Sequence, residues 1–265
     1  MKGPSRWGLR ALGLGYLSLL LLAPLVTIFF KAFEDGLAPP IDAITSPDGL
    51  HALKLTLLMV AIAVPLNTVF GVGCALLLVR SRWKGNAAID AVINLPFAIS
   101  PVVIGLSLFL LYGTDGWFGP ALAEAGIKIL FSVPGMVLAS IFVSLPFIVR
   151  ETVPVLQEIG TEQEQAASTL GANAWQTFWR VTLPAIRWGV AYGVVLTTAR
   201  VLGEFGAVTI VSGSITGQTQ TLPLFVEKQF QNFNLPGAYG ASILLALLAL
   251  TTLLAMNVLR RKEDA

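Results

Sequence analysis

Long stretches without a charged residue alternate with short polar intervals along this chain. Five runs lack Asp, Glu, Lys and Arg altogether: Leu12–Phe30, Leu55–Val79, Ala91–Thr114, Ile129–Val149 and Gln229–Leu259. Each reaches the roughly 17–25 residues that a helix needs to cross a bilayer. One more apolar run, the fifth in chain order, begins at Trp188 and is interrupted by the charged residues Arg200 and Glu204. The pattern predicts an all-α integral membrane protein, with six transmembrane helices in a single domain over residues 1–265.

The runs place the six spans at about Leu12–Phe30, Leu55–Val79, Ala91–Tyr112, Ile129–Val149, Trp188–Ile210 and Gly237–Leu259. Pro65 and Pro96 lie inside two of them, and a proline frees backbone carbonyls that neighbouring helices must satisfy, which favours a packed bundle. Gly189 and Gly193 have the spacing that lets helices approach closely, although a chain with 25 glycines also contains such pairs by chance.

The first span has two interpretations, because Lys2, Arg6 and Arg10 precede it as they would precede a signal peptide. Its apolar run is longer than the usual 7–15 residues of a signal peptide, and no clean A-x-A cleavage site follows it. We therefore expect a retained span.

Composition supports a membrane protein and excludes several kinds of site. The chain is 55% hydrophobic and 12% charged, about half the charge of a typical soluble domain. His51 is the only histidine and Cys74 the only cysteine. A histidine metal cluster is therefore excluded, and no convincing catalytic triad can be assembled. We expect no catalytic residue, no metal and no cofactor bound by this chain.

Lysine and arginine are distributed unevenly between alternate loops. The N-terminal segment, the second loop, the fourth loop and the C-terminal segment carry three each: Lys2, Arg6, Arg10, Arg80, Arg82, Lys84, Arg150, Arg180, Arg187, Arg260, Arg261 and Lys262. The opposite side carries Lys31, Lys54, Lys128 and Lys228. The positive-inside rule then places both termini in the cytoplasm. Basic residues interleaved with aromatic ones, as a nucleic-acid partner would require, are not clustered anywhere in the chain.

The longest polar interval, from Thr161 to Pro184 (the polar segment), falls on the cytoplasmic side in this topology. Thr161 and Glu164 have the spacing of a capping box, which predicts the start of a helix. Gly171 stands where that helix would end in a left-handed cap, and Asn173 can cap a second helix. Pro184 is expected to stop this second helix before the fifth span.

The first predicted helix carries a small apolar patch of Ala166, Ala167 and Leu170. A groove on a partner protein could accept such a patch. An ordinary helical hairpin lying on the membrane would show the same pattern, and the residues alone leave both interpretations open.

Arg200 and Glu204 lie four residues apart, which places them on one face of a helix. Arg200 falls near the middle of the fifth span, where a charge costs at least about 2.5–3.5 kcal/mol and normally faces a bundle interior or a pathway. Two roles remain open. The pair can order helix packing, or Arg200 can supply positive potential to a crossing anion while Glu204 limits its field.

The polar segment resembles the cytoplasmic coupling loop of type I ABC importer permeases, whose pattern is E-A-A-x-x-x-G-x(9)-I-x-L-P. This chain departs from the pattern at two positions, with Gln165 in place of Glu and Val181 in place of Ile; Glu164 stands one position early. In that family the loop inserts into a groove of an ATP-binding subunit. The resemblance assigns ATPase coupling to Glu164, Gln165, Ala166, Ala167, Leu170, Gly171, Leu183 and Pro184.

A second resemblance extends over residues 55–259, the expected permease core. GEFGAVTIVSGSITGQTQTLPL resembles the sulfate and molybdate permease branch, and LPFAISPVV, GWFGP and VPGMVLASIFVSLPFIVRE resemble the W-type subunit of sulfate/thiosulfate permeases. The resemblance implies a bacterial inner-membrane location, a T-type permease partner, two ATP-binding cassette subunits and an external sulfate-binding protein. The chain has no G-x-x-x-x-G-K-[ST] loop, so ATP and Mg²⁺ would be bound by the partner ATPase.

Other transport classes stay open at this point. Molybdate and tungstate permeases, which have a homodimeric core, carry related motifs for tetrahedral dianions. A stand-alone secondary transporter typically shows internal repeats and coupling-ion carboxylates in its spans; here Glu204 is the one candidate carboxylate and no repeat is evident. A membrane scaffold would not require the glycine and Leu-Pro register.

Overall fold

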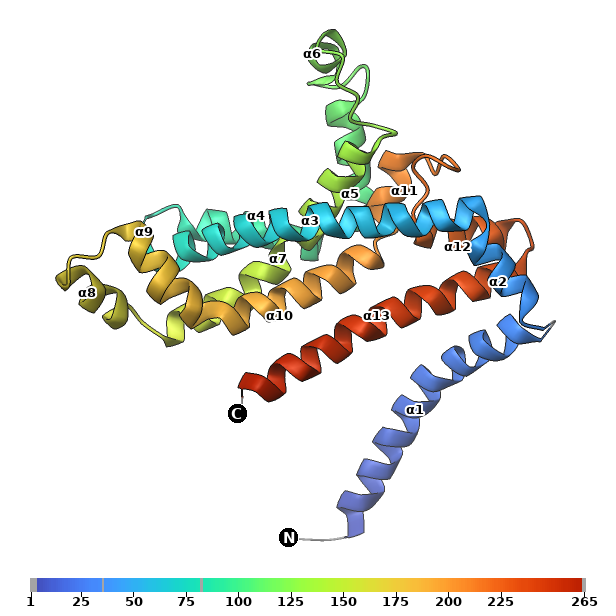
Figure 1. Cartoon of the computed structure of the whole chain (residues 1–265), viewed down its shortest axis with the longest axis horizontal. Coiled ribbons are helices and arrows are strands. Elements are labelled where there is room, and N and C mark those ends of the chain that lie inside the picture. Colours follow the sequence, from blue (N-terminus) through green and yellow to red (C-terminus); the bar gives the residue numbers. More distant parts are fainter. Residues whose placement is uncertain (1–3, 35, 82, 264–265) are drawn as a thin grey trace.

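The computed structural model describes residues 4–34, 36–81 and 83–263, and this described part is helical with no strand (Figure 1). Lys2 and Arg82, which the sequence counted in the N-terminal segment and the second loop, lie outside the described residues. The elements, in chain order, are α1 Pro4–Phe33, α2 Ala38–Thr45, α3 Pro47–Arg80, α4 Asn86–Ala98, α5 Pro101–Tyr112, α6 Gly119–Glu124, α7 Val133–Glu158, α8 Glu162–Thr169, α9 Ala174–Thr177, η1 Phe178–Thr182, α10 Leu183–Leu202, α11 Gly206–Ser212, α12 Leu222–Gln231 and α13 Leu235–Glu263.

Within the described residues, the helices agree with the expected membrane class. Four are long and apolar enough to cross a bilayer, namely Leu12–Phe33, Pro47–Arg80, Val133–Glu158 and Leu235–Asn257. Two bent helix pairs bring the count of candidate spans up to six. The sequence predicted one continuous helix for each of these two spans. The structure shows instead that each span consists of two helices joined by a bend.

The third span is broken between α4 and α5, which meet at an angle of 112°. Ile99 (φ −107°, ψ 136°) and Ser100 (φ −59°, ψ 137°) are not helical. Pro101 explains the conformation of Ser100, because the proline ring disfavours the helical region for the residue before it. Pro101 then starts α5 at a position where no backbone N–H is needed.

The fifth span is broken after Leu202, where α10 ends, and it resumes at Gly206 with a bend of 55°. The helices that follow the two breaks, α5 and α11, pack together. A Cβ on Gly206 would lie 3.0 Å from Pro101 Cβ, and one on Gly105 would lie 2.7 Å from the carbonyl oxygen of Ala207. Glycine is therefore needed where the two breaks meet.

The centre of the bundle is formed by α3, α7 and α10, which lie side by side in Figure 1. Gly71 of α3 and Gly193 of α10 both pack against Ile148 of α7. The spacing of Gly189 and Gly193, for which the sequence left chance open, does mark a close approach to α7: a Cβ on Gly189 would lie 2.7 Å from the carbonyl oxygen of Glu151, and one on Gly193 would lie 2.9 Å from Ile148 Cα. Asn67 is fully buried, and its Nδ2 donates to Ser144 Oγ at 2.7 Å, so a polar contact also fixes the register of α3 against α7.

Different short helices lie at the two ends of the bundle. α8 and α9 lie at one end, and α2 and α12 lie at the opposite end (Figure 1). The C-terminus of α13 points toward the end that carries α8 (Figure 1). The polar segment is thus a compact projection from one end of the bundle.

Candidate functional site

The polar segment begins with α8, which turns sharply at Gly171. The amide of Gly171 donates to the Ser168 carbonyl at 3.0 Å, and that of Ala172 donates to the Ala167 carbonyl at 3.1 Å. Gly171 has φ +85°, a left-handed conformation that side-chain-bearing residues seldom adopt. The glycine corner predicted from the sequence is confirmed.

Asn173 caps the second helix, as the sequence suggested, and the structure shows that this cap is a full capping box with Gln176. Asn173 Oδ1 accepts from the Gln176 amide at 2.9 Å, and Gln176 Oε1 accepts from the Asn173 amide at 3.0 Å. The capping box predicted at Thr161 is wrong, because the Thr161 side chain caps no amide. Its hydroxyl accepts instead from Gln165 Nε2 at 3.0 Å.

Pro184 does not end the second helix, and the expectation of a stop is also wrong. A π-helical turn, Phe178–Thr182, connects α9 directly to α10, and the Leu183 amide donates to the Phe178 carbonyl across this turn. Hydrogen bonds from i to i+5 widen the helix, so the carbonyls of the preceding turn lie further from the proline ring. Pro184 has no N–H to donate, and this pattern does not require one from it. The second helix of the polar segment therefore continues without a break through η1 into α10, as one rod from Ala174 to Leu202.

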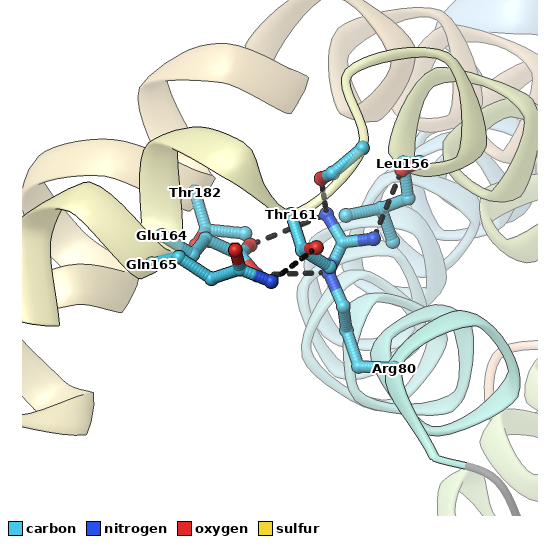
Figure 2. Close-up of polar contacts among 7 residues, drawn as sticks. Arg80, Leu156, Thr161, Glu164, Gln165 and Thr182 are labelled. Carbon is cyan, nitrogen blue, oxygen red and sulfur yellow. Dashed lines mark hydrogen bonds and ion pairs between the residues drawn. The ribbon is translucent and has the colours of Figure 1, made fainter.

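Glu164 turns inward, toward Arg80 at the end of α3 (Figure 2). Arg80 Nε lies 2.9 Å from Glu164 Oε2, and Nη2 donates to Glu164 Oε1 at 3.3 Å. Nη1 donates to the Leu156 carbonyl at 3.1 Å and Nη2 to the Gly160 carbonyl at 2.6 Å. The same Glu164 Oε1 accepts from the Thr182 hydroxyl at 2.8 Å.

Arg80 is a site residue that sequence reasoning missed, since it served only to orient the chain. Its partners lie 76 to 84 positions further along the sequence, and no local pattern links residues so far apart. The contact also explains the failed capping box, because a charged tertiary partner outcompetes a local backbone amide for the Glu164 carboxylate.

The outward surface of the segment is apolar and open. Leu170 is 89% exposed at the corner. A groove beside it is lined by Ala166, Ala167, Leu170, Val181 and Pro184, together with Ile159, Gln163, Arg180 and Ala185. Gln165 is exposed on α8, and Leu183 is half-buried against the core. The structure thus gathers the predicted site residues, with Glu164 and Leu183 facing inward and the others outward or at the corner.

Arg200 and Glu204 do form the predicted ion pair, but not on one helix face. Arg200 Nη1 lies 2.6 Å from Glu204 Oε2, and Glu204 lies in the break beyond the end of α10. Its Oε1 accepts from the Ala207 amide at 2.9 Å, at the start of α11. The Glu204 side chain is 3% exposed and that of Arg200 is 28% exposed. The pair therefore fixes the break as well as neutralising a buried charge.

A family of binding-protein-dependent transport system inner membrane components matches residues 67–264. The sulfate transport system permease protein CysW of Synechocystis sp. is 54% identical over 96% of this chain and 92% of its own length. CysW of Escherichia coli K12 is 47% identical over 96% and 88%. The sulfate permease protein CysT of the same organism is 37% identical over 93% and 89%. A bacterial ABC transporter that imports alginate has the same fold, with a TM-score of 0.79 at 20% identity over 96% of both chains.

Proposed function

The chain belongs to the family of binding-protein-dependent transport system inner membrane components, and we propose that it is the permease subunit of an ATP-driven sulfate importer. Sulfate, or the similar dianion thiosulfate, would cross by alternating access between the two sides of the membrane. The observation that carries this proposal is the 47–54% identity to CysW sulfate permeases over 96% of the chain. The permease itself performs no covalent chemistry.

The motor and the receptor would be separate proteins. Two ATP-binding cassette subunits would hold ATP and Mg²⁺, since this sequence lacks a phosphate-binding loop. A T-type permease would complete a heterodimer, a pairing supported by the 37% identity between this chain and a CysT protein. A sulfate-binding protein would deliver the anion on the outer side. Both termini and the polar segment would lie in the cytoplasm of a bacterial inner membrane.

The polar segment would receive the motion of the motor. The exposed Leu170 at its tip and the adjoining apolar groove form a surface that an ATP-binding subunit could bind. The continuous helix through η1 into α10 carries a displacement of this tip directly into the fifth span. Glu164 is engaged by Arg80 and Thr182, and this supports a role for it inside the segment, in place of the role of the leading glutamate of the family pattern. The docking contact at Gln165 would therefore be uncharged.

Arg200 would provide positive potential where the anion passes the break in the fifth span. Its guanidinium is partly exposed, whereas Glu204 beneath it is buried. Glu204 holds the guanidinium in place and reduces its net field, so that a dianion can leave as well as enter.

Complementation tests the transport proposal. A bacterium that lacks its own sulfate uptake should recover sulfate import when this chain is expressed with its T-type, ATPase and binding-protein partners. Excess molybdate should compete weakly; import of molybdate instead of sulfate, or a self-paired permease, would contradict the assignment. Replacement of Arg200 by alanine should lower uptake about tenfold or more, given the value of hydrogen bonds to charged groups. Thr198→Val, two positions away, serves as the matched control.

A further inference from the structure

Little apolar packing holds α8 against the spans. The helix has no buried residue, and its exposed face is the one that a partner would push. What ties it to the spans is the ion pair between Arg80 and Glu164, whose side chains are only 18% and 20% exposed. An ion pair this shielded is weakened less by salt and water than a surface pair.

The guanidinium also holds the end of α7. Leu156 lies in the last turn of α7 and Gly160 just beyond its end, and both offer carbonyls without a partner inside the helix. A cation at a helix C-terminus satisfies such carbonyls and complements the helix dipole. Arg80 is itself the last residue of α3. One side chain therefore joins the ends of α3 and α7 to α8.

The carboxylate of Glu164 extends this connection to a fourth element. Thr182, in the π-helical turn that leads into α10, donates its hydroxyl to the carboxylate oxygen that also accepts from Arg80 Nη2. Figure 2 shows the carboxylate between the two donors. A displacement of α8 must consequently move Arg80 and Thr182 together or break their contacts.

We propose that Arg80 is a positioning residue that transmits displacement of the polar segment to α3 and α7. The proposal rests on the proposed function, in which an ATP-driven motor moves this segment. A guanidinium is a planar fork whose donors have fixed directions, so three acceptors can be held in one geometry. Lysine keeps the charge but is a flexible point donor, and it cannot hold the carboxylate and both carbonyls in the same arrangement.

The first test measures coupling in the assembled complex. Arg80→Lys and Glu164→Gln are compared with wild type for sulfate imported per ATP hydrolysed, after size-exclusion chromatography has established assembly. Both variants should lower this ratio at least about fivefold, the lower range of typical coupling between sites. Arg187→Lys is the matched control and should leave the ratio unchanged; Arg187 is exposed and stacks on Trp188 without a carboxylate partner among the described residues.

The second test needs no sulfate and separates this inference from the proposed function. Hydrogen exchange of the complex is measured with and without ATP. In wild type, ATP should change exchange in α8 and also in the last turns of α3 and α7; in Arg80→Lys the change should stay confined to α8. If α3 and α7 respond equally in the variant, or if the transport ratio is unchanged, the inference is wrong. If Arg80→Lys does not assemble, the same comparison with Glu164→Gln decides.

Discussion

Substitution of Gly171 isolates the backbone geometry of the corner between α8 and α9. A Cβ added at this position would meet nothing within 4 Å, so a side chain there causes no steric clash. The cost comes from the φ of +85°, which penalises an L-residue by about 1–2 kcal/mol. Asparagine tolerates this conformation better than valine does. Gly171→Val should therefore distort the corner, whereas Gly171→Asn should largely preserve it.

The strain converts into a measurable loss of affinity. A penalty of 1–2 kcal/mol shifts an equilibrium by a factor of about 5–30, and the apparent affinity for a partner falls with the fraction of chains in the binding-competent form. The assay is titration of the purified permease pair with its ATP-binding subunit. Gly171→Val should weaken binding up to about 5–30-fold, and Gly171→Asn should bind close to wild type.

Gly217 provides the control for strain itself. It also has positive φ, at +70°, and open space around its Cβ position, but it lies in the connection between α11 and α12, away from the end that carries α8 (Figure 1). Gly217→Val should leave ATPase binding unchanged. The reasoning is refuted if Gly171→Val binds as tightly as wild type, or if Gly217→Val weakens binding equally.

Two further substitutions test the packing and capping of the rod that leads from α9 into the fifth span. Gly193→Ala should lower the melting temperature, because the added Cβ would lie 2.9 Å from Ile148 Cα and overpacking costs about 1–3 kcal/mol. Gly73→Ala places its Cβ in open space and should leave the melting temperature unchanged. Equal melting temperatures for the two variants would contradict the close α7–α10 contact. Asn173→Ala should cost about 1 kcal/mol of local stability through the lost cap, seen as faster hydrogen exchange at the start of α9, while Asn173→Ser should retain protection.

Local chemistry explains which parts of the site could be predicted from the sequence. The left-handed corner at Gly171 and the cap at Asn173 depend on residues within a few positions of each other. Long uncharged runs likewise mark membrane helices, whatever surrounds them. Pro101 also carried a local signal, since the residue before a proline avoids helical geometry, and the break at Ser100 was predictable from it.

The remaining features depend on contacts between distant parts of the chain. Glu164 pairs with Arg80 across 84 positions, so its local capping pattern was misleading. The π-helical turn before Pro184 lets the helix continue where proline usually ends it. The break at Glu204 is fixed by an amide of the following helix and by Arg200 together. None of these three arrangements follows from periodicity.

The central claim is that this chain couples ATP hydrolysis in a partner subunit to sulfate import through its polar segment. The most direct measurement is sulfate uptake, with and without ATP, by proteoliposomes containing the complete complex, with wild-type chain and with Gly171→Val. We predict ATP-dependent sulfate uptake for wild type and a clear loss of uptake for the variant. Uptake that needs no ATP, or that is unaffected by the strained corner, would contradict the claim.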